Sequence, residues 1–362
     1  MDRTAFLRRT ATAGTVAVLT LIFMVPLSAA ARGNHFTVDP LVSDNGVPGT
    51  NVDPNLVNAW GLAAGPSTPW WVADNATKVS TLYDGAGNVI PLVVTVGGGP
   101  TGLVYNGSAS DFIVSDGTNS GSALFIFASE DGMIRGWSPA VPPPPFSTQT
   151  EVAVDRSAEG AIYKGLAIAD GRNGPRLYAA DFHNARVDVF DGSWNLIRRR
   201  HAFVDRKLPD GFAPFGIQAI GSHIFVSYAK QDAAAKDELA GQGLGFVDAY
   251  DLAGHLQARV ARRGLLNAPW GLARAPSSFG RFGGDLLVGN FGNGRINAYG
   301  NEDGRFEHEG QLRTGRHQPV AIDGLWALEF GNGDAAGPKN TLFFTAGPGD
   351  ESHGLFGSIT AG

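Results

Sequence analysis

The chain has 362 residues, with 50 glycines, 21 prolines and no cysteine. The absence of cysteine excludes disulfides, a thiolate nucleophile and thiolate metal sites. The formal net charge of −6, without a visible basic stripe, argues against nucleic acid as a partner. The many glycines and prolines favour short strands joined by tight turns over a helical fold.

The first 31 residues have the three-part layout of a signal peptide. A head with three arginines precedes an apolar stretch, residues 11–27, and small residues follow at Ala30 and Ala31. Such segments are removed on export, so we predict a mature protein in the periplasm or outside the cell. A membrane anchor is the alternative, for which so short a stretch containing Pro26 is marginal. No later segment has spanning length, so we expect a mature form that is not embedded in a membrane.

A short motif, in which glycine is followed by a large apolar residue, recurs six times along the remaining chain. Further apolar runs follow each motif, and most units then have a turn of the Asp-Gly type, which is a strong hairpin signal. Each unit therefore predicts three or four short antiparallel strands. The six glycines are Gly61, Gly102, Gly165, Gly216, Gly271 and Gly324, and the units begin near residues 58, 100, 163, 213, 268 and 322.

Six units of about 40–55 residues predict an all-β, six-bladed β-propeller. A single unit of this size cannot bury both faces of its sheet in water, whereas radial packing covers sheet with sheet. Glycine suits the start of the inner strand, because inner strands approach one another closely at the propeller axis. We expect one domain over residues 32–362.

Three segments depart from the regular pattern. Residues 35–44 form an alternating run before the first unit, and the last unit lacks an outer strand. We therefore expect the N-terminal strand to join the C-terminal blade and close the ring, which removes an open sheet edge. In the long second unit, either residues 150–157 form the outer strand or residues 111–117 form an inserted hairpin. Residues 230–243 are the one segment with a helical pattern.

Three passages carry a resemblance to a known family: residues 41–63, 163–191 and 324–359. They resemble exported bacterial β-propellers that are often associated with PEP-CTERM protein-sorting systems. The resemblance implies a six-bladed propeller related to NHL and SMP-30-like folds, and it implies no activity. The chain ends without the Pro-Glu-Pro signal of sorted members, so we do not expect surface anchoring by that route.

Loops that enter the first strand, and loops that join strands two and three, open on one face of such a propeller, which we call the funnel face. Aromatic rings beside carboxylates and amides are suited to binding a small molecule, a glycan or a protein. The opposite face is expected to carry turns only. The candidate ligand-binding residues are Trp60, Asp74, Asn75, Lys164, Asp181, His183, Asn184, Trp270, Asn290, Asn293, Asp323 and Asp350. The same face is expected to include Asn58, Asp116, Phe215, Tyr228, Trp326, Glu351 and His353.

The recurring polar residue after the second run, at Asp74, Asp181 and Asn290, has two interpretations. Its oxygens suit Ca²⁺, and the related lactonase-type propellers hold such an ion at the axis. Alternatively, each side chain caps its own loop by accepting from backbone amides, and its recurrence in several units favours the cap.

Catalytic signals are weak. His183 with Asp181 is a candidate base with its orienting carboxylate, but no nucleophile elbow and no zinc pattern occur, so no catalytic residue is assigned. We expect a non-catalytic binding protein that needs no cofactor, with a divalent-metal-dependent hydrolase of lactonase or esterase type as the alternative.

Overall fold

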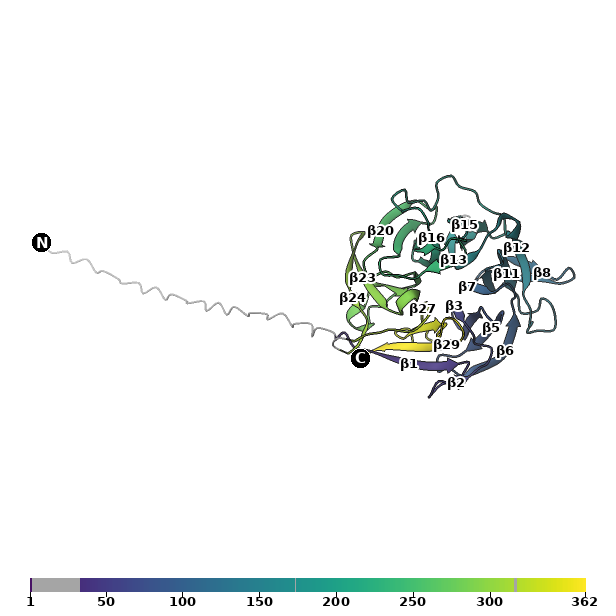
Figure 1. Ribbon diagram of the computed structural model, residues 1–362, viewed down its shortest axis with the longest axis horizontal. Coiled ribbons are helices and arrows are strands. Elements are labelled where there is room, and N and C mark those ends of the chain that lie inside the picture. Colours follow the sequence, from purple (N-terminus) through teal and green to yellow (C-terminus); the bar gives the residue numbers. More distant parts are fainter. Residues whose placement is uncertain (2–32, 173, 316–317) are drawn as a thin grey trace. The chain divides into compact units, whose positions relative to one another are not determined.

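The computed structural model describes residue 1 and residues 33–172, 174–315 and 318–362. The signal peptide expected over residues 1–31 therefore lies almost wholly outside the described residues. From residue 33 onward, the described chain is built from strands, and its helical segments are three-residue 3₁₀ turns. Figure 1 shows these strands grouped into blades around a common centre, which confirms the predicted six-bladed propeller.

Each blade contributes one inner strand that lies next to the propeller axis (Figure 1). The inner strands are β3 (Ala59–Ala63), β7 (Pro100–Tyr105), β13 (Tyr163–Gly171), β16 (Phe212–Ile220), β21 (Pro269–Arg274) and β27 (Leu325–Phe330). In every blade, the inner strand pairs antiparallel with the next strand of the same sheet.

The outer parts of the blades follow in sequence order, except at the ring closure. Blade one adds β4 (Trp70–Asp74), β5 (Val79–Tyr83) and β6 (Val89–Thr95), and blade two adds β10 (Phe125–Ser129), β11 (Met133–Trp137) and β12 (Glu151–Asp155). Blade three adds β14 (Gly174–Asp181) and β15 (Arg186–Asp191). Blade four adds β17 (His223–Gln231), β18 (Glu238–Leu239), β19 (Phe246–Asp251) and β20 (Leu256–Arg262). Blade five adds β22 (Leu286–Asn290), β23 (Ile296–Glu302) and β24 (Arg305–Gln311).

Blade six combines the two ends of the described chain, as the sequence predicted. It contains β27, β28 (Leu342–Ala346) and β29 (Leu355–Ala361), followed by β1 (Phe36–Ser43) and β2 (Asn51–Val52). β1 pairs antiparallel with β29 from Phe36 opposite Ala361 to Ser43 opposite Leu355. Phe36 is fully buried, with ring centroids 5.1 Å from Phe279 and 6.0 Å from Phe282, so the closing strand also contributes to the core.

The second unit contains both features that the sequence had offered as alternatives. β12 is the outer strand of blade two, and β8 (Ile113–Ser115) pairs with β9 (Ser120–Ser122) as a separate inserted hairpin. A second small hairpin, β25 (Arg313–Gly315) with β26 (Gln318–Pro319), precedes blade six.

Two local expectations were wrong. Residues 230–243 do not form a helix, because this segment continues β17, turns, and returns as β18 to pair with β17. In the first five blades, the glycine of the repeated motif lies within the inner strand. In blade six, this position is taken by Ala327 and not by Gly324. A methyl group on Gly271 would meet the carbonyl of Trp326, and the Ala327 amide donates to Thr345 Oγ1 as the Gly216 amide donates to Ser227 Oγ.

Much of the core lies between adjacent blades. Trp71 of blade one stacks on Phe125 of blade two with ring centroids 4.2 Å apart. On the other side of blade one, Tyr83 stacks on Phe356 of blade six at 5.3 Å. Because each blade uses both faces in this way, removal of one contact at the ring closure weakens the whole propeller.

We predict that Phe36→Ala lowers the free energy of unfolding by about 3 kcal/mol or more, since it removes a buried aromatic ring and leaves a cavity. Urea denaturation measures this directly. Thr37→Ala, at an exposed position of the same strand, is the control. Equal denaturation midpoints for the two variants would show that β1 does not close the ring.

Candidate functional site at the propeller axis

An aromatic cluster closes the centre of the ring on the funnel face. It is built from residues that directly precede an inner-strand glycine or, in blade six, Ala327. The rings of Trp60 and Trp326 are stacked, with centroids 3.5 Å apart, and Trp270 meets both rings edge-on at 6.2 and 5.8 Å. We call these three residues the indole plug. All three are buried, so an open channel does not run along the axis at this level.

Lys164 occupies the equivalent position in blade three and lies against the indole plug. Its ammonium nitrogen is 4.9 Å from the ring centroid of Trp60, within the range of a cation–π contact. The same nitrogen lies 2.7 Å from Glu130 Oε1 and 3.3 Å from Asp237 Oδ1. Only 1% of the Lys164 side chain is exposed, so these partners replace water around a buried charge.

Four carboxyl groups surround Lys164, and we call them the acidic rim: Glu130, Asp237, Glu238 and Glu351. Glu130 comes from the turn between β10 and β11, Asp237 and Glu238 from the segment at β18, and Glu351 from the turn between β28 and β29. Asp237 is the most accessible of those in contact with Lys164, with 54% of its side chain exposed. Asp237 is therefore the member of the rim that solvent reaches most readily.

Burial and the lysine charge act in opposite directions on these groups. Burial alone would lower the pKa of Lys164, but Glu130 and Glu238 outweigh it and the pKa is raised. Burial would raise the pKa of Glu130, but the nearby Lys164 charge lowers it. For Glu238 burial dominates and raises the pKa to about 8, and burial also raises the pKa of Glu351. Near neutral pH, the cluster thus combines a fixed ion pair with a carboxyl group that can exchange a proton.

Amide and indole groups complete the cluster. Asn75 Nδ2 donates to Glu130 Oε2 at 3.1 Å, and Trp326 Nε1 donates to Asn58 Oδ1 at 3.2 Å. The indole N–H groups of Trp60 and Trp270 are buried without a hydrogen-bond partner among the described residues. Buried donors of this kind normally have an acceptor, and their presence here marks the axis as a place where polar groups are not fully satisfied.

The structure brings together four of the predicted site residues: Trp60, Asn75, Lys164 and Trp270. Of the wider set of polar and aromatic residues expected on this face, Asn58, Trp326 and Glu351 also belong to the cluster.

The predicted calcium ligands do not converge on the axis, because each binds its own blade. Asp74 is fully buried and accepts from Thr81 Oγ1 at 2.9 Å. Asp181 accepts from Asn184 Nδ2 and is paired with Arg186. The remaining residue, Asn290, accepts from a backbone amide and donates to Asn293 Oδ1 at 3.1 Å. Asp181 and Asn290 accept from backbone amides, which matches the loop-cap interpretation, whereas Asp74 Oδ1 is buried without a partner among the described residues. The described part of the chain has no group of three His, Asp or Glu side chains arranged to hold a metal ion.

The other predicted residues lie in the surrounding loops. His183 contacts the carbonyl of Ala235 through Nδ1 at 3.2 Å, and no hydrogen bond joins it to Asp181 among the described contacts. Asp323 accepts from the Gly349 amide at 2.9 Å. Asp350 is exposed at a turn, where its φ is 52°. These positions belong to the funnel face but not to the axial cluster.

Sequence reasoning missed three members of the acidic rim. Glu130 was not among the candidate residues, and Asp237 and Glu238 lie in residues 230–243, the segment with a helical pattern. One signal was present: residues 230–243 interrupt blade four with several charged residues, whereas the turns between strands two and three of blades one, two, three and five are short. An insertion at that turn of a propeller extends the funnel face.

The propeller face opposite the funnel face has a pocket in addition to the expected turns. A pocket of about 180 Å³ opens there, lined mainly by apolar residues of the inner strands. One acidic side chain, Glu329, lies in it and accepts a hydrogen bond from Gln218 Nε2 at 2.9 Å. Burial raises the pKa of Glu329 to about 7. This face therefore carries a titratable group of its own.

No helix in residues 33–172, 174–315 and 318–362 is long and apolar enough to cross a bilayer.

Comparison with known proteins gives several sequence relatives, uncharacterized proteins of one virus, and several structural ones. No protein-family model matches the chain. An uncharacterized protein of Acanthamoeba polyphaga mimivirus is 33% identical over 333 residues, which cover 89% of this chain and 79% of the viral one. This homologue is viral, whereas the resemblance noted in the sequence implied bacterial proteins.

Solved structures share the fold at low identity. Virginiamycin B lyase from Staphylococcus aureus has a TM-score of 0.50 at 11% identity, over 90% of this chain and 99% of the lyase. A glucose dehydrogenase has a TM-score of 0.55 at 12% identity, over 90% of this chain and 99% of the enzyme. Identities this low show the fold alone, which is the six-bladed β-propeller.

The raised pKa of Glu329 gives a prediction for stability against pH. The folded protein holds the Glu329 proton up to about pH 7, whereas the unfolded chain releases it near pH 4.3. The stabilisation is therefore present below the unfolded pKa and is lost as pH rises through 7. Relative to wild type, Glu329→Gln should gain up to about 3 kcal/mol of stability between pH 5 and pH 8.5.

Denaturation curves at the two pH values measure this gain. Glu307→Gln, at an exposed position of β24, is the control and should show no comparable change. A constant difference between wild type and Glu329→Gln across this range would mean that Glu329 is not buried as described.

Proposed function

We propose that this chain, which belongs to the same protein family as its uncharacterized mimivirus relative, is a non-catalytic binding protein whose funnel face takes a small ligand with a positively charged group. The observation that carries this proposal is the imbalance of charge at the axis. Four carboxyl groups of the acidic rim gather around two ammonium groups, that of Lys164 and that of Lys236, whose nitrogen lies 3.8 Å from Asp237 Oδ2.

The position of Lys164 supports a cationic ligand in a second way. Its ammonium group lies over the Trp60 ring with carboxylates beside it, which is the environment that recognises ammonium ligands elsewhere. A ligand cation would meet Asp237, Glu238 and Glu351 from the solvent side. Since Glu238 has a pKa of about 8, its ionisation adds a negative charge to the rim as pH rises.

The alternative function is a divalent-metal-dependent hydrolase of lactonase or esterase type. It would need oxygen ligands that converge at the axis, and Asp74, Asp181 and Asn290 are engaged in their own loops instead. The proton-exchanging Glu238 beside Lys164 would be the group most suited to acid–base chemistry. We favour binding because the described contacts supply charge but no metal ligand set.

We further propose that the protein works after export, in the periplasm or outside the cell, without a cofactor and without a nucleic-acid partner. The basis is the signal-peptide layout of residues 1–31. The bacterial setting and the association with protein-sorting systems remain predictions from the sequence resemblance.

The experiment compares choline with 3,3-dimethyl-1-butanol, a neutral molecule of nearly the same shape. Titration calorimetry should detect choline binding alone. The affinity should rise between pH 6.5 and 9 as Glu238 ionises, and it should fall in 0.5 M salt because exposed charges are then screened beyond about 3–5 Å. Asp237→Asn should weaken binding about tenfold, and Glu238→Gln should remove the pH dependence.

Asp350→Asn, at an exposed turn outside the axial cluster, is the matched control. Equal binding of the two probes, or no binding of either, would contradict the proposal. Stabilisation by Ca²⁺ that is lost in Asp74→Asn would instead support the hydrolase.

A further inference from the structure

Blade three is incomplete at its outer edge. Its sheet has three strands, β13, β14 and β15, whereas each of the other five blades has at least four. Beyond β15, the chain makes one bridge, between Phe190 and Leu196, and one hydrogen bond from the Ile197 amide to the Val189 carbonyl at 2.7 Å. It then leaves the sheet, and no described group pairs with the outward N–H and C=O of Val187.

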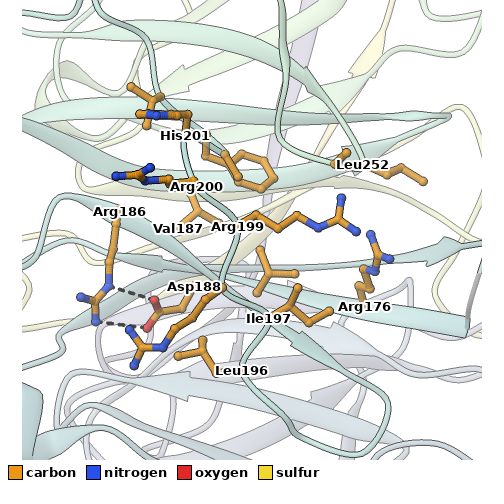
Figure 2. A pocket seen from close by; sticks show the side chains of 16 residues that line it. Arg176, Arg186, Val187, Asp188, Leu196, Ile197, Arg199, Arg200, His201 and Leu252 are labelled. Atoms are coloured by element: carbon orange, nitrogen blue, oxygen red, sulfur yellow. Dashed lines mark hydrogen bonds and ion pairs between the residues drawn. The ribbon is translucent and has the colours of Figure 1, made fainter.

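A groove lies along this open edge. Its volume is about 530 Å³, and its apolar lining includes Val187, Val189, Leu196, Ile197, Phe203 and Leu252. Figure 2 shows Arg176 and Arg199 on the Leu252 side of the pocket and the paired Arg186 and Asp188 on the other side. A second hollow of about 640 Å³ adjoins it and shares Arg176, Arg199 and Leu252 with it.

The groove carries positive charge that the protein does not neutralise. Arg186 is paired with Asp181 and Asp188. The other four arginines of the lining form no ion pair with a described carboxylate: Arg176, Arg198, Arg199 and Arg200. The formal net charge of the chain is −6, so the excess of positive charge at this groove is a local feature. Three of these arginines are consecutive at 198–200, and folding adds Arg176 of β14 to them, so a local basic cluster exists although the chain as a whole has no basic stripe.

We propose that this groove binds an extended acidic peptide, which pairs with β15 as the fourth strand of blade three. Main-chain hydrogen bonds to Val187 would fix its register, and the period of two along a strand would direct its side chains alternately. One set faces the apolar lining, and the other set places carboxylates against the arginines, where bidentate pairing is favoured. The open backbone edge and the apolar floor distinguish this site from a surface for a polysaccharide or nucleic acid, which needs neither.

The groove lies at the outer edge of a blade and uses none of the residues of the acidic rim. It is thus independent of the ligand proposed for the axis, and either proposal can fail without the other.

The experiment uses a fluorescein-labelled peptide, Val-Glu-Val-Glu-Val-Glu, and the full mature chain. Fluorescence anisotropy should show saturable binding. The same peptide with every internal amide N-methylated keeps its charge but has no main-chain N–H to donate along either edge, and it should bind at least about tenfold more weakly. Arg176→Glu combined with Arg199→Glu should weaken binding by a similar factor, since both changes reverse charge complementarity.

The matched control is Arg305→Glu, an exposed arginine in the outer strand of a complete blade, which should bind as wild type does. Equal binding of the methylated and unmethylated peptides to wild type would overturn the proposal without reliance on any variant. Tighter binding of a heparin oligosaccharide or of single-stranded DNA than of the peptide would also overturn it.

Discussion

At five of the six junctions around the axis, a glycine of one inner strand lies directly against the backbone of the next inner strand. A methyl group at Gly61, Gly102, Gly165, Gly216 or Gly271 would come closer than 3.0 Å to that backbone, a separation that side-chain carbons do not adopt. The radius of the ring therefore depends on the absence of a side chain at these positions. The same spacing places the preceding residues around the axis, where they form the indole plug and hold Lys164.

The sixth junction uses a different solution at the ring closure. Ala327 takes the place of glycine, and Thr345 Oγ1 both accepts from the Ala327 amide and donates to the Trp60 carbonyl. The tightest ring contact of the indole plug, between Trp60 and Trp326, spans this same junction. Hydrogen bonding and indole stacking thus join blade six to blade one, while β1 fastens the outer part of blade six. The closed ring then fixes the loops from which the acidic rim is assembled.

The sequence was sufficient to predict features that depend on local pattern. Alternating apolar runs and Asp-Gly turns predicted the blades, and the unpaired run at residues 35–44 predicted the closing strand. Trp60 and Trp270 were placed on the same face because both precede a strand glycine. Ala327 was missed because the search required glycine, although Trp-Ala-Leu repeats the Trp-Gly-Leu pattern around it.

Features that depend on distant parts of the chain could not be predicted in the same way. Glu130, Asp237 and Glu351 lie far apart in the sequence and meet only because blades two, four and six face one axis. The pKa of Glu238 is raised by burial, which no local pattern records. The open edge of blade three was equally hidden, because residues 196–204 contain apolar residues that are compatible with a fourth strand and instead form the side of a groove.

The stability of Gly216→Ala tests the central constraint most directly. Its added methyl group would overlap the Trp270 carbonyl of the neighbouring strand, and we expect a loss of about 2 kcal/mol or more in the free energy of unfolding. Gly107→Ala is the comparison, because Gly107 is exposed and an added methyl there meets only the Tyr105 ring at an ordinary 3.6 Å. Equal stability of the two variants would contradict the account, since it would show that neighbouring inner strands are not held in contact at the axis.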